Sequence, residues 1–277
     1  MPPRHELGEV LRWLIEAGAD EAVGDQPVDR LANTPHQPVV AKDVPVTVAA
    51  QPAVAPPPPA AAAPPPPAVS RPSRPVAAAA GSADLSLISD IEALRRQVEA
   101  FEGCALKLTA TNTVFADGNP KARLMFVGEA PGAEEDRRGL PFVGASGRLL
   151  DRMLAAIGLD RGNVFITNVI YWRPPGNRTP LPAEVAACLP FVERAIELVD
   201  PAVLVLLGGA SAKTLLGRQE GIMRLRGRWH SFATPRMASP IPAMATFHPA
   251  YLLRSPGQKR EAWRDFLAVR ERLDTDV

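Results

Sequence analysis

One stretch, from Val127 to Leu150, restricts the fold of this chain more than any other. It reads V-G-E-A-P-G-A-E-E-D-R-R-G-L-P-F-V-G-A-S-G-R-L-L and follows a short apolar run, residues 122–127, of the kind that forms a buried strand. From Gly128 to Gly144 it holds four glycines, two prolines and four acidic residues, and an amphipathic helical pattern begins directly afterwards. The stretch therefore predicts a buried strand, a shaped loop and a helix in direct succession.

Further apolar runs and helical patterns alternate along the rest of the sequence. Buried strands are predicted at residues 122–127, 164–170, 203–207 and 243–247. Helices are predicted at residues 86–101, about 145–157, 182–199, 208–217 and about 258–273. Strands separated by helices predict a parallel sheet that is covered on both faces. The expected fold class is therefore α/β, a three-layer α/β/α arrangement with a central four-stranded parallel sheet.

The acidic loop within this stretch is expected to be a binding region. In open α/β sheets, ligands bind outside the carboxyl ends of the strands, so the loop side chains would face a crevice. These side chains are Glu129, Glu134, Glu135, Asp136 and Phe142. Alternatively, the acids are solvated and the glycines only turn the chain. The loop lacks the Gly-Lys-Ser/Thr of a Walker loop and the G-x-G-x-x-G pattern, which makes a phosphate-binding loop a weak alternative.

Composition divides the chain into three regions. Residues 46–85 consist mainly of alanine and proline with two tetraproline runs, which predicts a disordered, extended linker. Residues 1–45 carry four Lys/Arg against eight Asp/Glu, whereas residues 86–277 carry 25 against 21. The last region is predicted to be the folded domain. Its mild basicity confines any nucleic-acid surface to a local patch.

The N-terminal region contains one amphipathic helical pattern. One face of a helix over residues 6–19 would carry five apolar side chains, those of Leu7, Val10, Leu11, Leu14 and Ile15. Nothing else in residues 1–45 is expected to cover that face. The helix is therefore expected either to dock on the folded domain or to bind a partner protein.

The cysteine and histidine content argues against a disulfide framework and against a metal site. The chain has two cysteines, Cys104 and Cys188, and its four histidines have no ligand-like spacing with them. The N-terminus lacks the basic-then-apolar layout of a signal peptide, and the apolar stretches are far shorter than a membrane span. The sequence therefore predicts a cytoplasmic protein without membrane contact.

Four motifs follow one another in the sequence. They are G-E-A-P-G-A-E-E-D-R-R-G-L-P-F-V-G at 128–144, T-N-V at 167–169, R-P-P-G-N-R at 173–178 and H-P-A-Y-L-L-R at 248–254. In this order they resemble the motifs of the family 4 uracil-DNA glycosylases. The resemblance covers roughly residues 100–275 and leaves the first hundred residues uncovered.

The resemblance implies an enzyme that flips uracil out of DNA and hydrolyses its N-glycosidic bond. An abasic site would remain, and base excision repair would begin there. The alternative is a non-catalytic relative that binds DNA or damaged DNA and is recruited through the N-terminal helix. The expected partners are uracil-containing DNA and, through that helix, a repair or replication protein.

By this resemblance, three residues contact the uracil base. Phe142 would stack on the flipped base, although a lone phenylalanine is more often part of a core. The side-chain amide of Asn168 offers a donor and an acceptor, which match O4 and N3–H of uracil. His248 would donate a hydrogen bond to O2, where negative charge collects as the base departs.

The water that attacks the sugar is expected to lie beside the acidic loop. The candidates that position it are Glu135 and Asn177, with Glu129 and Asp136 as neighbours, and the resemblance leaves open which contributes most. One of the loop glutamates would also crowd C5 of the base and thereby exclude the methyl group of thymine.

DNA contacts are expected from two basic runs. In L-L-R-S-P-G-Q-K-R, either Leu252 or Leu253 would wedge into the base stack. The phosphates would be contacted by Arg254, Lys259 and Arg260. In M-R-L-R-G-R-W, an extended segment would direct three side chains toward one face, or would be a solvated edge strand; they are Arg224, Arg226 and Arg228.

The chain departs from the family at the cysteines. Family members typically carry four cysteines that bind a [4Fe-4S] cluster, and Phe101 and Trp172 occupy two of these positions here. Cys104 and Cys188 match the other two and are interpreted as remnants of the ligand set. Neither aromatic side chain can bind iron, and both could fill the vacated space. We therefore expect a monomer without cluster or metal, in which the two thiols lie close together.

Overall fold

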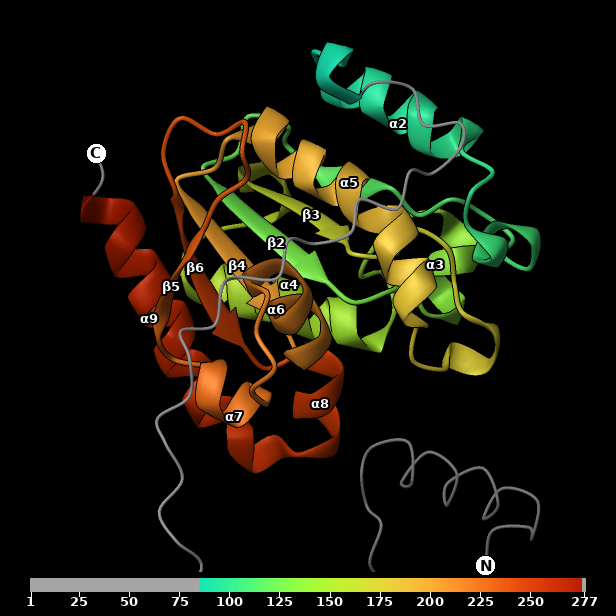
Figure 1. Ribbon diagram of the computed structural model, residues 1–277. Helices are drawn as coiled ribbons and strands as arrows, with labels where there is room; N and C mark the ends of the chain where they lie inside the picture. The colour runs from blue at the N-terminus through green and yellow to red at the C-terminus, as the bar shows by residue number, and fades with distance from the viewer. Residues whose placement is uncertain (1–84, 276–277) are drawn as a thin grey trace, which may run out of the picture. The chain divides into compact units, whose positions relative to one another are not determined.

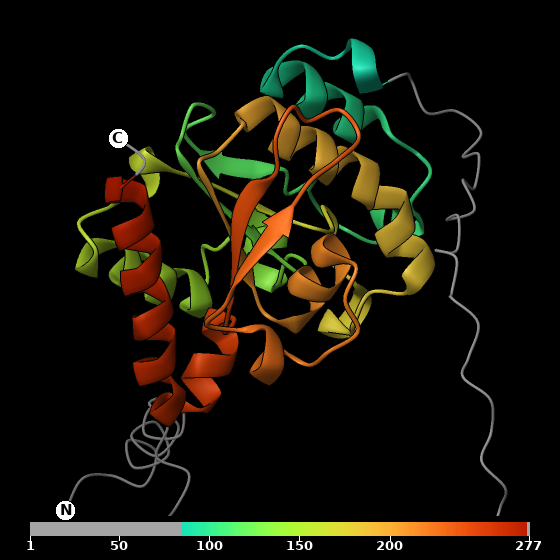
Figure 2. The ribbon, with the colours of Figure 1, turned by 60° about the vertical axis from the view of Figure 1, so that its left-hand side comes forward.

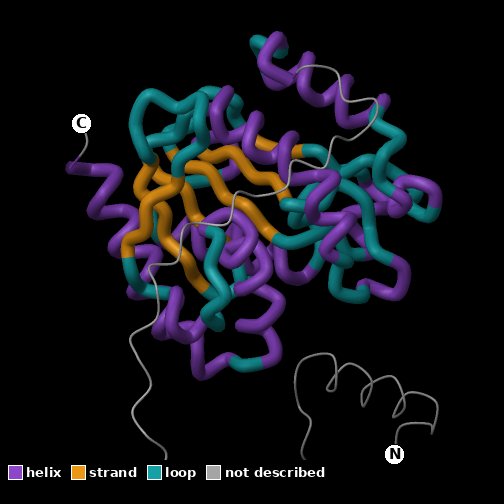
Figure 3. The backbone as a smooth tube through the Cα atoms, in the orientation of Figure 1, coloured by secondary structure: helices purple, strands orange, loops and turns teal. Residues whose placement is uncertain are grey.

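The computed structural model describes residues 85–275, which form a six-stranded sheet between layers of helices (Figure 1). The strand order is β1-β3-β2-β4-β6-β5. The four inner strands are parallel, and the edge strands β1 and β5 pair antiparallel with their neighbours. Figure 3 shows this sheet in orange at the centre of the domain. The strands are β1 (Ala116–Gly118), β2 (Leu124–Gly128), β3 (Val164–Asn168), β4 (Val203–Leu207), β5 (Trp229–Phe232) and β6 (Ile241–Thr246).

The helices of the described residues include several short ones close to the loops. The 3-10 helices are η1 (Leu85–Leu87), η2 (Ala105–Leu108), η3 (Arg161–Asn163), η4 (Pro175–Asn177) and η5 (Pro256–Gln258). The α-helices are α2 (Ile91–Ala100), α3 (Ala133–Arg138), α4 (Ala145–Ala156), α5 (Pro182–Val199), α6 (Gly209–Leu216), α7 (Ile222–Leu225), α8 (Pro249–Arg254) and α9 (Lys259–Thr275).

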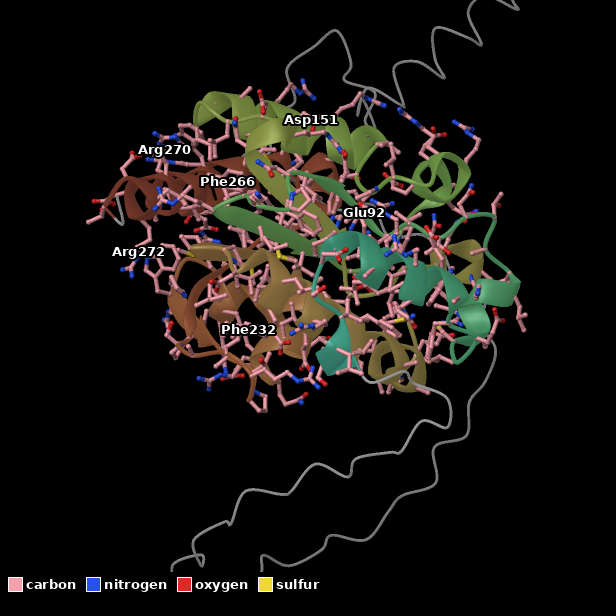
Figure 4. The ribbon with its side chains drawn as sticks, turned by 90° about the horizontal axis from the view of Figure 1, so that it is seen from above. Glu92, Asp151, Phe232, Phe266, Arg270 and Arg272 are labelled. Carbon is pink, nitrogen blue, oxygen red and sulfur yellow. The ribbon has the colours of Figure 1, made fainter. Side chains whose placement is uncertain are left out.

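Each face of the sheet packs against its own helices, because side chains alternate between the two faces along a strand. Val127 of β2 belongs to the core that includes α2 and α5, whereas its neighbour Phe126 packs against α4 and α9. Figure 2 shows α9 in red on one side of the sheet and α5 in gold on the other. Seen from above, Asp151 of α4 and Phe266 of α9 lie on the same side (Figure 4). The predicted three layers are confirmed.

The four predicted strands are the four inner strands, and their ends agree with the observed ends within two residues. The sheet has six strands instead of the predicted four, because the two edge strands, β1 and β5, were not predicted. The first, β1, has only the three residues A-D-G, and three of the four side chains of β5 are at least partly exposed. Neither segment shows the continuous apolar run of a buried strand.

Most of the predictions for residues 1–85 concern residues outside the described part of the chain. The exception is Leu85, which begins η1 and is buried, so the folded domain includes this residue of the predicted linker. Within residues 85–275, no helix combines the length and the apolar character needed to cross a membrane.

The parallel strands bring the sequence motifs together at one edge of the sheet. Gly128, at the end of β2, is in register with Asn168, at the end of β3. Strand β6 ends at Thr246, two residues before His248. Because carboxyl ends of neighbouring parallel strands lie at the same edge, residues far apart in the sequence become neighbours there.

Candidate active site

A cavity of about 410 Å³ opens at this edge of the sheet. Its volume is in the range of sites that bind small molecules. Its walls come from the loop after β2, the end of β3, the segment around η4 and helix α8. The predicted site residues that line it are Glu129, Glu135, Phe142, Asn168, Asn177, His248 and Arg254. The cavity therefore unites residues from all four motifs.

The backbone of Gly128 separates two of these side chains. A Cβ atom at this position would lie 2.3 Å from Asn168 Oδ1 and 2.6 Å from the Phe142 ring. Both distances are shorter than a van der Waals contact, so the arrangement requires a residue without a side chain. This glycine thereby allows an amide and an aromatic ring to approach each other across the strand end.

Asn168 presents a buried polar atom to the cavity. The residue is 2 % exposed, and its Oδ1 atom has no hydrogen-bond partner anywhere in residues 85–275. Leaving a buried acceptor without a donor costs free energy, and native structures rarely do so. Because Asn168 lines the cavity, a bound ligand that carries a donor would satisfy this atom.

Phe142 has an unusual backbone conformation for a bulky residue. Its φ of 54° lies in the left-handed region, which favours glycine. Its ring is buried and stacks on the imidazole of His248, with ring centroids 5.4 Å apart and an angle of 29° between the planes. The ring therefore lines the cavity in a fixed position, between the end of β3 and the start of α8.

His248 precedes α8 and caps its first turn. Its Nδ1 atom accepts the backbone N–H of Ala250 at 3.1 Å, so Nδ1 carries no proton. In the neutral ring the proton is then on Nε2. Burial lowers the pKa of His248 to about 4, and the charge of Arg254 acts in the same direction, while Glu135 opposes them. At neutral pH the residue is thus a neutral donor fixed in one tautomer.

The lowered pKa gives a direct spectroscopic prediction. As pH falls from about 8 to about 5, the ring nitrogen NMR signals of His248 should stay at their neutral positions and change only near the pKa of about 4. An unfolded histidine titrates near 6.5, so the stability that comes from a neutral ring is lost as pH falls from 6.5 toward 4. The spectrum of His248→Gln identifies the signal, and a midpoint near 6.5 would contradict the assignment.

Glu135 is occupied by the backbone of its own loop. One carboxylate oxygen accepts the N–H groups of Val143 and Gly144, each at 2.9 Å, and the other accepts the N–H of Gly132 at 3.2 Å. Both oxygens therefore hold the loop in shape. This use of the carboxylate argues against the expected role of Glu135 as the main water-positioning acid.

The neighbours of Glu135 in the E-E-D run point elsewhere. Asp136 is buried and accepts the backbone N–H groups of Thr111 and Asn112, at 2.8 and 3.1 Å. Glu134 pairs with Arg137 on the surface of α3. Neither lines the cavity, so the expectation that the whole acidic run faces the crevice is wrong for these two residues.

Glu129 is the remaining acid of the loop, and it lines the cavity. Among the described residues its carboxylate has no hydrogen-bond or ion-pair partner, unlike those of the other three acids. Burial raises the pKa of Glu129. A partly buried carboxylate without a protein partner is available to a water molecule or a ligand.

Asn177 and its neighbours form the opposite wall. The residue lies in η4 with φ of 55°, and its Oδ1 accepts the Nε–H of Arg173 at 2.7 Å. Its amide nitrogen is therefore the group left for the cavity. Arg178 forms two hydrogen bonds with Glu184, at 2.6 and 2.9 Å, which fix the end of this segment to α5.

Burial decides between the two predicted wedge residues. Leu252 is buried under α8 against Leu149 and Phe247, so it cannot enter a base stack. Leu253 is 40 % exposed and remains the candidate. Of the predicted phosphate contacts, Arg254, Lys259 and Arg260 are all exposed, and Arg254 also lines the cavity.

The three arginines of the second basic run do not alternate along an extended segment. Arg224 lies in the short helix α7, and Arg228 precedes β5. Arg226 pairs with Asp265 and, at 3.2 Å, with Glu261, and its side chain is only 14 % exposed. It fastens α7 to α9 and faces away from solvent, so the prediction of a shared DNA-binding face is wrong.

Sequence reasoning missed several residues that line the cavity, among them Ser146, Thr179 and Tyr251. Ser146 and Tyr251 lie inside or beside motifs that had been recognised. The sequence could therefore have predicted that these two residues lie near the site. Only the structure shows that helix α4 places Ser146, and helix α8 places Tyr251, at the cavity wall.

Cys104 and Cys188 are both buried, and each affects the pKa of the other, in line with the predicted closeness of the two thiols. The neighbouring Cys188 thiol lowers the pKa of Cys104 to about 7, against the opposing effect of burial. The Cys104 thiol, together with burial, raises the pKa of Cys188.

Several aromatic rings belong to the same buried core as the two thiols. Phe101 stacks on Trp172 with ring centroids 6.4 Å apart and meets Phe191 edge-on at 4.9 Å. Trp172 is buried and donates its indole N–H to the Thr113 hydroxyl at 3.0 Å. No three potential metal ligands cluster anywhere in residues 85–275. Two thiols beside packed rings do not fit a cluster that needs about four thiolates.

Comparisons with known proteins agree with this geometry. The family model of the uracil DNA glycosylase superfamily matches residues 115–267. A type-4 uracil-DNA glycosylase of Archaeoglobus fulgidus is 39 % identical over 188 residues, which are 66 % of this chain and 94 % of the relative. One of Sulfurisphaera tokodaii is 39 % identical over 189 residues, 66 % of this chain and 85 % of the relative.

A third type-4 uracil-DNA glycosylase, from Thermotoga maritima, is 41 % identical over 166 residues, 60 % of this chain and 84 % of the relative. The matched region of the family model contains the loop after β2, the end of β3, the segment around η4 and helix α8, and therefore the whole cavity described above. On the motifs, the fold and these matches, the chain belongs to the uracil-DNA glycosylase superfamily, and type-4 enzymes are among its relatives there.

Proposed function

We propose that this protein excises uracil from DNA by hydrolysing its N-glycosidic bond, leaving an abasic site and thereby starting base excision repair. The names of the type-4 relatives support the activity. The observation that carries the site assignment is the buried Oδ1 of Asn168, which has no protein partner within the described residues. A flipped uracil would supply the missing donor.

Recognition of the base follows from the chemistry of the Asn168 amide. N3–H of uracil would donate to Oδ1, and the amide nitrogen would donate to O4. Cytosine carries an acceptor at N3 and a donor at C4, so both contacts would become repulsive or unpaired. Such a mismatch at a buried polar group gives strong discrimination. The fixed Phe142 ring would stack on the base as the amide reads its edge.

His248 would stabilise the departing base. As the bond to the sugar breaks, negative charge collects on N1 and O2 of uracil, and an oriented donor there lowers the barrier by about 3 kcal/mol. The neutral imidazole, with its proton on Nε2 because Nδ1 accepts from Ala250, supports this role. No proton transfer from His248 is required.

Glu129 is the acid best suited to position the attacking water. Its carboxylate lines the cavity and has no partner among residues 85–275, whereas that of Glu135 accepts three backbone N–H groups. Asn177 offers its amide nitrogen as a donor that would orient the same water. Loss of the Glu129 carboxylate should slow hydrolysis through water positioning while leaving uracil recognition intact.

DNA would be held beside the cavity by α8 and the start of α9. Leu253 is the exposed wedge candidate, and Arg254, Lys259 and Arg260 are the candidate phosphate contacts. The enzyme is proposed to act as a monomer. The helix predicted at residues 6–19 is proposed to recruit a repair or replication protein, and the enzyme is proposed to work in the cytoplasm.

The direct test uses the full-length protein and matched oligonucleotides that contain uracil, cytosine or thymine at one position. Uracil substrates, single- or double-stranded, should give alkali-labile abasic sites, and the other two should remain intact. A protein that binds uracil DNA but leaves it uncut in enzyme excess would instead be the non-catalytic relative. The uncommitted Glu129 carboxylate favours the catalytic reading, since binding alone does not require it.

We further propose that the protein carries no [4Fe-4S] cluster. The purified protein, prepared without oxygen, should be colourless and should lack stoichiometric iron and sulfide, because Phe101 and Trp172 supply no iron ligand and pack in the same core as the two thiols. Iron, sulfide and the visible spectrum are the measurements. About four irons per chain and a brown colour would overturn this proposal.

A further inference from the structure

Phe142 holds its ring in the cavity through a backbone conformation that a phenylalanine does not favour by itself. Its φ of 54° is left-handed, and its carbonyl lies against α4, where a Cβ at Gly147 would come within 1.7 Å of the carbonyl oxygen. A residue in this conformation persists only when its surroundings determine it. Contacts of the loop with other elements must therefore fix the peptide groups around Phe142.

Glu135 fixes the N–H groups of the loop, because it accepts the two N–H groups that follow Phe142. Arg161 fixes the carbonyl groups of the loop. One terminal nitrogen of its guanidinium donates to the Pro141 carbonyl at 3.2 Å, and the other donates to the Phe142 carbonyl. The peptide group between Phe142 and Val143 is thus held at its carbonyl by Arg161 and at its N–H by Glu135, and the peptide group before Phe142 is held at the Pro141 carbonyl by Arg161.

Arg161 is itself held by two acids from separate elements. Its Nε–H donates to Asp151 of α4 at 2.8 Å, and a terminal nitrogen donates to Asp117 of β1 at 2.7 Å. The guanidinium fork suits this arrangement, since its donors diverge in one plane and it stays charged. The loop carbonyls are therefore tied through one side chain to the edge strand and to the helix on one face of the sheet.

Arg161 does not line the active-site cavity and faces a separate surface hollow with Asp151. Of the residues that Arg161 hydrogen-bonds, Phe142 is the one that lines the cavity. We propose that Arg161, supported by Asp117 and Asp151, is a positioning residue that keeps the Phe142 ring where a flipped base stacks. This inference rests on the proposed stacking role of Phe142.

The test is a double-mutant cycle with Arg161→Gln and Phe142→Leu, measured as the single-turnover rate of uracil excision at saturating enzyme. Arg161→Gln should lower that rate about tenfold or more, because a small misplacement of a contact group is costly, with DNA affinity within about twofold of wild type. When Phe142 is already leucine, Arg161→Gln should change the rate by less than about twofold. Arg161→Lys should be intermediate, since it keeps the charge without the fork.

The matched control is Arg270→Gln, which removes an arginine from an exposed ion pair with Asp274 on α9 and should leave the rate unchanged. If Arg161→Gln does not fold, Asp151→Ala removes one acceptor of the arginine and replaces Arg161→Gln in the same double-mutant cycle. Equal effects of the arginine substitution with and without the Phe142 ring would overturn the proposal while leaving stacking intact. A Phe142→Leu enzyme with the wild-type rate would remove the stacking role and the proposal with it.

Discussion

Replacing His248 by alanine is expected to lower the single-turnover rate of uracil excision about a hundredfold or more, because the departing base would lose its fixed donor. The imidazole has its Nδ1 occupied by the Ala250 N–H and a pKa of about 4, so the Nε2 proton is present throughout the neutral range. The loss should therefore be nearly constant across neutral pH. Excision from a uracil oligonucleotide in enzyme excess is the measurement.

Two further variants distinguish an electrostatic role of His248 from a structural one. His248→Gln retains a side-chain donor in the same region and should recover part of the rate, whereas a purely structural role would leave both variants equally impaired. His230→Ala is the matched control, since this second partly buried histidine bonds to the Leu225 carbonyl and does not line the cavity. A His248→Ala enzyme within about threefold of wild type would contradict the proposed electrostatic role.

Replacing Asn168 by alanine is expected to reduce uracil excision by a factor of about a hundred to a thousand, because both hydrogen bonds to the pyrimidine edge disappear. The fold should tolerate the change. Alanine removes a buried acceptor that has no partner within residues 85–275, so the melting temperature should stay near that of wild type. Lost activity with retained stability distinguishes a ligand-binding amide from a structural one.

Asn119→Ala is a suitable control for this second experiment. Its side chain caps an exposed turn through the Lys121 N–H and lies outside the cavity, so excision should be unchanged. The uracil analogue with a methyl group on N3 provides a complementary test, because wild type should reject it and Asn168→Ala should be indifferent to it. If the Asn168→Ala protein melts much earlier yet cuts normally, the amide serves the fold and the recognition scheme fails.

The sequence predicted the inner part of this protein well. Each of the four inner strands is a short, nearly continuous apolar run, and such runs are buried in a parallel sheet with both faces covered. The edge strands escaped prediction because most of their residues are at least partly exposed, so neither strand shows a continuous apolar run. The three α/β/α layers followed from the alternation of strands and helices alone, whereas the number of strands in the sheet did not.

Sequence alone also determined which chemical groups are available. The motifs supplied the amide, the imidazole, the aromatic ring and the acids of the site, and the cysteine count left only two thiolates for a cluster. The available chemical groups depend on residue identity and local spacing, and both can be read directly from the sequence. Family membership followed from the same residues, and the comparisons agree with it.

Only the tertiary structure decided how those groups are used. Glu129, Glu135 and Asp136 are chemically similar and close in sequence, yet two hold backbone amides and one remains free for a ligand. Leu252 and Leu253 are adjacent and identical, but one is buried under α8. Each outcome depends on donors, acceptors and packing surfaces that the parallel sheet and its connecting helices bring together. Local sequence patterns do not encode contacts between segments that are far apart in the chain.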